Sequence, residues 1–247
     1  MQPPIFIINM ASSIERWHTT SSRLQAIGLE GTRFEATVGK ALSEQEVASW
    51  YSAELNLKRH HRNMTPGEIG CYISHMRIWR KMRDENIPFC IVLEDDIKIE
   101  PHLVDVIEQI DKLSKWDLVK LSDNCANSFI DEVKLSDKYI LGNYLKVPNC
   151  CNGYALSLDG AKKLLNRKPF FRPVDVDIQF HSEVSLNITG IKPYPIDEDL
   201  SFISDIASVN NGRHSNRSTF WRNFRHRKDM YFQRKKISAD LSKITPK

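Results

Sequence analysis

Three consecutive carboxylates follow a strongly apolar segment near the middle of the chain. Residues 89–93 are apolar or cysteine, as in a buried strand, and Glu94, Asp95 and Asp96 come directly after them. Successive strand side chains face opposite sides, so Glu94 and Asp96 are expected to share a face, while Asp95 points away or lies in the turn. Two carboxylates at a strand end suit Mn²⁺ or Mg²⁺, which prefer oxygen ligands. The alternative is a solvated acidic turn partly neutralised by Lys98.

The elements around these acids alternate between strand and helix. Apolar runs predict strands within residues 3–10, 31–39, 88–100 and 116–123. Capping signals and helical spacing predict helices over residues 12–28, 42–56, 65–87 and 101–113, and a further helix from about residue 158. We therefore expect one α/β domain over residues 1–205, with a mostly parallel central sheet flanked by helices. The acids then lie at the carboxyl end of a strand, where open α/β sheets bind ligands.

Composition narrows the setting of the protein. Among 247 residues, 41% are hydrophobic, and no apolar run reaches the length of about 18 residues expected of a membrane-spanning helix. The amino-terminal segment lacks a basic region and a small-residue cleavage site, so we do not expect a secretion signal. The five cysteines show no disulfide-like or CxxC spacing. These features predict a reducing, cytoplasmic setting.

Basic and aromatic residues gather near the carboxyl terminus. Residues Arg213–Lys236 hold nine Lys or Arg and one acid, a net +8 against +4 for the whole chain. We expect residues 206–247 to form a helical extension that binds an anionic membrane surface, because aromatic rings and basic side chains suit the headgroup level. Nucleic-acid binding and a helix simply packed on the core are the alternatives.

Several blocks, taken together and in this order, resemble glycosyltransferase family 25, the bacterial lipooligosaccharide glycosyltransferases. They are "IFIINM" with Arg16, "TPGEIGCYISHMRIW", "IVLEDDI", "NGYALSLDGAKKLL" and "PVDVDIQ", spanning about residues 4–205. The resemblance implies a GT-A fold with an acidic metal motif at a strand end. It also implies a nucleotide-sugar donor, usually UDP-galactose, a lipooligosaccharide acceptor, and a β-linked product formed with inversion.

The resemblance, together with the residue patterns, assigns provisional roles around the donor. Asp96 is the preferred metal ligand, with Glu94 as a second and Asp95 as a donor contact. Donor contacts are also expected from four residues of the first half of the chain: Asn9, Arg16, Glu35 and His75. A surface charge for Arg16, a turn cap for Glu35 and a core position for His75 are the competing interpretations.

Inversion requires a carboxylate that takes the proton of the acceptor hydroxyl opposite the leaving group. Asp175 and Asp177 lie just after Pro173 and are the candidates, with Asp177 preferred; the alternative for both is helix capping. Further acidic alternatives are Asp197, Glu198, Asp199 and Asp205. Gly153 and Tyr154 are expected to line the acceptor side, where an aromatic ring can stack on a sugar, and core packing is the alternative.

The sequence therefore predicts a metal-dependent, inverting glycosyltransferase on the cytoplasmic face of the inner membrane. It would move galactose from UDP-galactose to a terminal sugar of lipooligosaccharide. The alternatives are a UDP-glucose-dependent enzyme of the same pathway, a phosphotransferase or nucleotidyltransferase using the same strand end, and a nucleic-acid-binding protein. A P-loop enzyme is disfavoured, since no GxxxxGK[ST] motif is present, and no nucleic-acid partner is expected.

Overall fold

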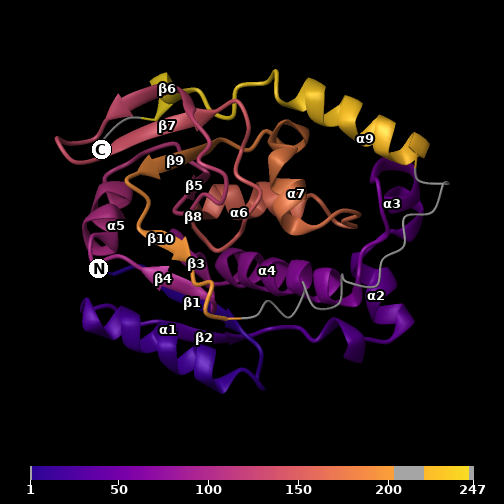
Figure 1. The fold of residues 1–247 in the computed structure, drawn as a ribbon, viewed down its shortest axis with the longest axis horizontal. Coiled ribbons are helices and arrows are strands. Elements are labelled where there is room, and N and C mark those ends of the chain that lie inside the picture. The colour runs from indigo at the N-terminus through magenta and orange to yellow at the C-terminus, as the bar shows by residue number, and fades with distance from the viewer. Residues whose placement is uncertain (1, 203–219, 245–247) are drawn as a thin grey trace.

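The computed structural model describes residues 2–202 and 220–244, which form a mixed α/β structure around one eight-stranded sheet (Figure 1). The strand order is β2-β1-β3-β8-β5-β9-β7-β6. In that order the strands are Thr32–Glu35, Ile5–Asn9, Phe89–Glu94, Gly153–Ser157, Leu118–Lys120, Ile188–Lys192, Ile140–Tyr144 and Phe129–Lys134. A separate antiparallel ribbon pairs β4 (Ile97–Ile99) with β10 (Ile196–Glu198).

Strand direction divides the sheet. The pairs β2–β1, β1–β3 and β5–β9 are parallel, whereas β8 and β7 run antiparallel to both of their neighbours. Six of the eight strands therefore point the same way, as expected, but the sheet is mixed. Apolar periodicity could not reveal the reversal, because it reports which residues are buried and not the direction of the strand.

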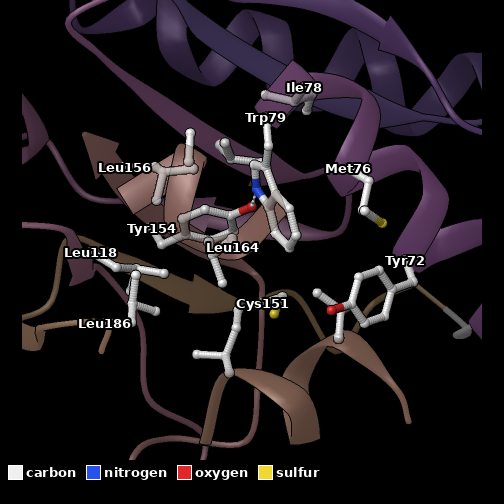
Figure 2. Packing of buried hydrophobic residues seen from close by; sticks show 14 of the residues in the cluster. Tyr72, Met76, Ile78, Trp79, Leu118, Cys151, Tyr154, Leu156, Leu164 and Leu186 are labelled. Atoms are coloured by element: carbon white, nitrogen blue, oxygen red, sulfur yellow. Dashed lines mark hydrogen bonds between the residues drawn. The ribbon is translucent and has the colours of Figure 1, made fainter. Parts of the chain in front are cut away.

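Helices cover both faces of the sheet. One core cluster joins Phe6, Ile8 and Val92 to residues of α4 (Pro66–Asp84), α6 (Leu158–Leu165) and α7 (Val174–Gln179). The other joins Ile7 and Leu93 to residues of α1 (Ile14–Ala26) and α5 (Leu103–Asp111). The alternating side chains of β1 and β3 thus face two helical layers. Figure 2 shows the first cluster, in which Trp79 and Tyr154 meet in the fully buried centre.

Helix α4 carries residues of the pocket walls described below, and its start matches the sequence prediction. Thr65 is the N-cap, its Oγ1 accepts from the Glu68 backbone N–H, and Glu68 accepts in return from the Thr65 N–H. Gly70 permits a close backbone approach: a Cβ there would lie 2.3 Å from the Thr37 carbonyl oxygen. Ser74 Oγ then accepts a 2.8 Å hydrogen bond from the Thr37 N–H. Residues 36–40, including the short 3₁₀ helix η1 (Gly39–Ala41), are thereby held against α4.

The expected helix over residues 42–56 is divided into α2 (Glu44–Trp50) and α3 (Ala53–Arg59). The break occurs because Tyr51 and Ser52 are extended beside Phe170: the Ser52 N–H donates to the Phe170 carbonyl at 2.9 Å. A contact with a residue more than a hundred positions away overrides the local helical signal here.

The carboxyl-terminal residues belong to the same body as the sheet. Helix α9 (Phe220–Gln233) contacts α3, and Arg222 Nε donates to the His60 carbonyl at 2.9 Å. Beyond it, Ser238 accepts from Ile188 of β9, and Leu241, in the 3₁₀ helix η4 (Leu241–Lys243), is buried in the second core cluster. The expected boundary at residues 205/206 and the basic residues Arg213 and Arg217 lie outside the described residues. Within the described ranges, no helix is long and apolar enough to cross a membrane.

Candidate active site

The carboxylates at the end of β3 lie where two adjoining pockets meet. Glu94 and Asp96 line both pockets, as the expectation of a shared face requires. The first pocket, which we call the β1 pocket, has a volume of about 290 Å³, and the second, the α7 pocket, about 250 Å³. Cys71 of α4 is the third residue common to both. A ligand spanning the two pockets would therefore pass directly over the acidic pair.

The two pockets differ in character. The β1 pocket is walled largely by apolar side chains and by backbone of the loop after β2, and its residues include Ile8, Met10, Arg16, Ala36, Thr37, Val38, Gly39 and Ser74. The α7 pocket is more polar, with Arg62, Glu68, Asn124, Asn149, Asn152, Asp175 and Glu198 among its residues. An apolar slot beside a cation suits a base with phosphates, whereas amides and carboxylates suit the hydroxyls of a sugar.

Asp95 turns away from the acidic pair and is fixed by the first strand and helix. Asn9 Nδ2 donates to Asp95 Oδ2 at 2.5 Å, and Arg16 lies 3.4 Å from its other oxygen. Arg16 also lies 3.8 Å from Asp96, so one guanidinium faces two of the three acids. Asn9 is 1% exposed and also accepts from Arg33, so in this structure it orients Asp95. Arg16 and Asp95, in contrast, reach the wall of the β1 pocket.

The negative charge around Glu94 is under-compensated. Burial, then the neighbouring Asp96, Asp175 and Asp95, raise the pKa of Glu94 to about 8. The pKa of Asp96 is also raised, first by burial and then by Asp95. Lys120 opposes this effect on Glu94, but its ammonium is fully buried and donates to the Cys150 carbonyl. The pair is therefore poised to gain from a further cation.

These residues fit a divalent cation. Glu94 and Asp96 supply carboxylate oxygens, the ligands that Mg²⁺ and Mn²⁺ prefer. On the other side of Glu94, the buried His75 Nε2 has no hydrogen-bond partner within the described part of the chain and lies 4.0 Å from Glu94 Oε1. Burial lowers the pKa of His75 to about 3, which keeps this ring neutral. A cation at this donor set would share Asp96 with the Arg16 guanidinium, which lies 3.8 Å from it.

The two candidate bases have different environments, and the geometry reverses the preference for Asp177. Asp177 is 2% exposed, and its carboxylate accepts from Tyr72, from Arg167 at 2.8 Å and from Arg172. Glu183 pairs with the same two arginines, so Asp177 belongs to a buried ionic network that ties α7 to α4. Three donors are thus bonded to an Asp177 carboxylate that is almost inaccessible, which disfavours it as the acceptor of a substrate proton.

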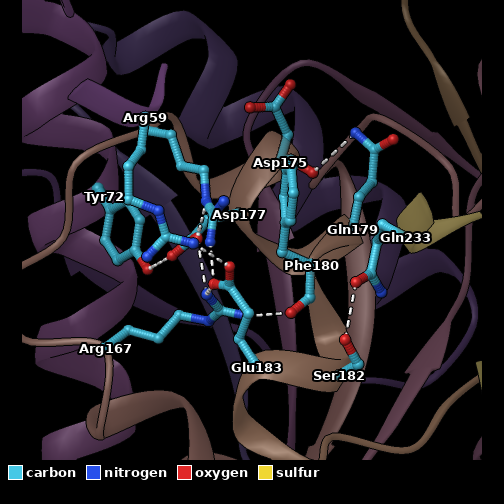
Figure 3. Close-up of polar contacts among 11 residues, drawn as sticks. Arg59, Tyr72, Arg167, Asp175, Asp177, Gln179, Phe180, Ser182, Glu183 and Gln233 are labelled. Carbon is cyan, nitrogen blue, oxygen red and sulfur yellow. Dashed lines mark hydrogen bonds and ion pairs between the residues drawn. The ribbon is translucent and has the colours of Figure 1, made fainter. Parts of the chain in front are cut away.

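Asp175, by comparison, lines the α7 pocket with Glu94 and Asp96. Figure 3 shows its carboxylate pointing away from the arginine network around Asp177. Burial raises the pKa of Asp175, and no cation of that network is bonded to it. Asp175 is half-buried, lies at the wall of a polar pocket and has a raised pKa, and these are properties expected of a general base.

Three residues predicted to contact the donor or the acceptor line neither pocket. Tyr154 is fully buried, with its hydroxyl 2.8 Å from His75 Nδ1 and accepting from Trp79 at 3.1 Å, so its ring cannot stack on a sugar in this structure. Gly153 is also buried, packed against Ile196. Glu35 is exposed at the end of the edge strand β2 and lines neither pocket; the adjacent residues Ala36 and Thr37 do. Aromatic and acidic residue types alone did not reveal these positions.

Some site residues gave no clear signal in the sequence. Lys120 reads as part of an apolar strand, and only the fold brings it beside Glu94 and Asp175. Arg62 pairs with Glu68 at 2.5 Å on the wall of the α7 pocket, although Glu68 was explained by helix capping alone. The basic run "LKRHHR" before α4 was the one available hint for Arg62.

The chain thus combines a mixed α/β sheet with paired carboxylates at a strand end, between an apolar and a polar pocket. Comparison with known proteins gives the family. The family model described as glycosyltransferase family 25 (LPS biosynthesis protein) matches residues 2–179, so the chain belongs to this family. The match includes the three acids after β3 and both Asp175 and Asp177.

Curated relatives agree with this family. The chain is 33% identical over 181 residues to a glycosyltransferase 25 family member of Drosophila pseudoobscura pseudoobscura. It is 31% identical over 192 residues to procollagen galactosyltransferase 2 of Mus musculus, and 29% identical over 192 residues to the Homo sapiens protein of that name. Each match covers 70% of this chain but only 28% or 29% of the relative, so the chain spans less than a third of these proteins.

Proposed function

We propose that this protein is an inverting glycosyltransferase of GT-A fold that transfers galactose from UDP-galactose to a sugar acceptor. The observation that carries the proposal is the position of Glu94 and Asp96 at the junction of the two pockets. In this arrangement the β1 pocket binds the uridine diphosphate, and the α7 pocket binds the acceptor. The names of the galactosyltransferase relatives support galactose as the donor sugar.

The acceptor is activated by Asp175. Its carboxylate, with a raised pKa, takes the proton of an acceptor hydroxyl as that oxygen attacks the anomeric carbon. The bond from the anomeric carbon to the diphosphate oxygen breaks in the same step, and UDP leaves toward the β1 pocket. Attack from the α7 pocket and departure into the β1 pocket occur on opposite faces of the sugar, which inverts the configuration.

Glu94 and Asp96 would hold Mn²⁺ or Mg²⁺, and such an ion offsets the charge that develops on the leaving diphosphate. Arg16 contributes a fixed positive charge on the same side, since it faces both Asp95 and Asp96. Asn9 orients Asp95, and the Asp95 carboxylate holds this guanidinium in place. Asn9 itself does not contact the donor in this proposal.

We further propose a lipooligosaccharide acceptor and peripheral attachment to the cytoplasmic face of the inner membrane. The description of the family as LPS biosynthesis proteins supports the acceptor. Helix α9 supports the attachment: five of its aromatic side chains are more than half exposed, namely Phe220, Trp221, Phe224, Tyr231 and Phe232. They lie on the side of the helix away from Met230 and Gln233, which are buried, and Lys228 and Lys235 are interspersed among them. Such a face suits an anionic headgroup layer.

A donor panel tests the activity. UDP-galactose, UDP-glucose and UDP-N-acetylglucosamine are each incubated with the chain and a truncated lipooligosaccharide, with and without Mn²⁺. We expect transfer from UDP-galactose that needs the metal and is abolished by Asp96→Asn, with the unfolding temperature of that variant retained. Full transfer by the Asp96 variant would refute the metal assignment, and a preference for UDP-glucose would refute the donor. Free procollagen peptides serve as the alternative acceptor, because several relatives are named procollagen galactosyltransferases.

A further inference from the structure

Three histidines lie together where α9 meets α3. His60 is the C-cap of α3, His61 follows it, and His226 comes from the middle of α9. The ring centroids of His60 lie 4.3 Å from His61 and 5.1 Å from His226, and those of His61 and His226 are 4.7 Å apart. One ring nitrogen from each residue lies within 4.8 Å of the others.

Several ring nitrogens of this histidine cluster are buried and have no hydrogen-bond partner among the described residues. His60 is 1% exposed, and neither of its ring nitrogens has a hydrogen-bond partner within the described residues. The same holds for buried Nδ1 atoms of His61 and His226. Buried polar atoms are nearly always bonded, and leaving one unbonded is destabilising. Four such nitrogens at one contact therefore call for a ligand.

The charge state favours a metal over an anion. Burial, followed by repulsion from the neighbouring histidines, lowers the pKa of His60 to about 2. Burial and His226 likewise lower the pKa of His61 to about 4, and burial lowers the pKa of His226. Burial thus opposes the charged form of all three rings, and the neutral form is the one in which imidazole coordinates metals.

The nearby positive charges in the described part of the chain are Arg62, Arg172, Arg222 and Arg234, and the first two are compensated by carboxylates. Arg62 pairs with Glu68, and Arg172 pairs with Asp177 and Glu183. Arg222 donates to the His60 carbonyl at 2.9 Å and to Asn63 Oδ1 at 3.1 Å. Asp229 of α9 also faces His226.

We propose that His60, His61 and His226 form a binding site for a late first-row divalent metal of the zinc type, which fastens α9 to α3. Three imidazoles suit zinc, and a fourth position would be open to water. Tetrahedral Zn–N bonds of about 2.0–2.1 Å place ligand nitrogens ~3.3 Å apart, so side-chain rotation must close a gap of at most about 1.5 Å. This site is separate from the carboxylate pair, whose oxygen ligands suit harder ions.

The test uses the full chain, stripped with a chelator, then titrated with Zn²⁺ and, in parallel, with Co²⁺ as a spectroscopic probe. We expect about one tightly held zinc per chain, tetrahedral cobalt bands without a thiolate charge-transfer band, and a higher unfolding temperature with zinc. His226→Ala and His61→Ala should lose the bound zinc and the thermal shift. His18→Ala, which changes an exposed histidine of α1, is the matched control and should behave as the wild type.

The Asp96→Asn variant distinguishes zinc bound by the three histidines from a cation bound by the carboxylate pair. Zinc retained by Asp96→Asn but lost by His226→Ala supports the proposal, whether or not sugar transfer is observed. Zinc that survives both histidine substitutions, or the absence of tetrahedral cobalt bands in the wild type, would overturn it. Because the cobalt spectrum of the wild type is decisive by itself, a variant that fails to fold leaves the proposal testable.

Discussion

Exchanging Asp175 and Asp177 for asparagine one at a time tests the proposal that the first is the catalytic carboxylate and the second a structural one. The two residues are two positions apart on α7 and undergo the same chemical change, so each variant is the control for the other. Asp175 lines the α7 pocket and carries a raised pKa, whereas Asp177 is bonded to Tyr72, Arg167 and Arg172 in the core.

Asp175→Asn is expected to lose catalytic rate, whereas Asp177→Asn is expected to lose stability. Loss of a general base lowers kcat by about 10²–10⁴-fold, which is roughly 3–5 kcal/mol in the activation free energy. Removing one partner of a buried ion pair costs about 3–5 kcal/mol of stability; Glu183 remains for both arginines, so we take the lower end. At ~2–4 °C per kcal/mol for a protein of this size, Asp177→Asn should unfold about 6–12 °C lower.

The assays are UDP release coupled to acceptor transfer and thermal unfolding followed by circular dichroism. Asp175→Asn should be inactive with an unfolding temperature near that of the wild type. Asp177→Asn, assayed well below its lowered midpoint, should retain most of its kcat. In the wild type at saturating Mn²⁺, kcat/KM should rise with pH as Asp175 loses its proton, and the Asp175 variant should lack that limb. The reasoning fails if Asp177→Asn is inactive at an unchanged midpoint while Asp175→Asn turns over normally.

Three further outcomes follow from the geometry. The pKa of Glu94 is about 8 in the folded protein, above the ordinary value of 4.5, so the stability of the protein falls as pH rises between these values. In metal-free protein, Glu94→Gln should therefore raise the unfolding temperature at pH 8.5 and leave it unchanged at pH 4. An effect that does not depend on pH would contradict this. Gly70→Ala should cost about 1–3 kcal/mol and raise the donor KM, because the new Cβ lies 2.3 Å from a backbone oxygen of the loop that walls the β1 pocket; an unchanged denaturation midpoint would count against the close approach. Replacing both Trp221 and Phe224 by serine should weaken sedimentation with anionic vesicles by about tenfold or more. The control Ile130→Ser, also at an exposed apolar residue, should sediment as the wild type does. Equal binding by the wild type, the double variant and the control would exclude α9 as the membrane contact.

Local signals in the sequence were sufficient for several elements. The capping box at Thr65 and Glu68 marked the start of α4, and the apolar run before Glu94 marked β3, because both depend on neighbours within a few residues. Glu94 and Asp96 both line the two pockets, although β3 ends at Glu94 and strand alternation does not extend to Asp96. Direction and helix breaks were missed: β8 runs antiparallel, and the helix before Tyr51 stops where the distant Phe170 pairs with the chain.

By itself, the sequence determined the α/β class, the acidic strand end and the family, because these are written in periodicity, composition and ordered motifs. Only the tertiary structure decided which of two near-identical aspartates faces the pocket. Asp175 and Asp177 share a helix and a residue type, and they differ in what the rest of the chain brings to them: the arginines Arg167 and Arg172 to one, and Glu94 to the other. The same holds for Tyr154, whose ring could have met a sugar but instead packs beside His75. Burial and charge partners come from residues far apart in the chain, and a linear pattern does not contain them.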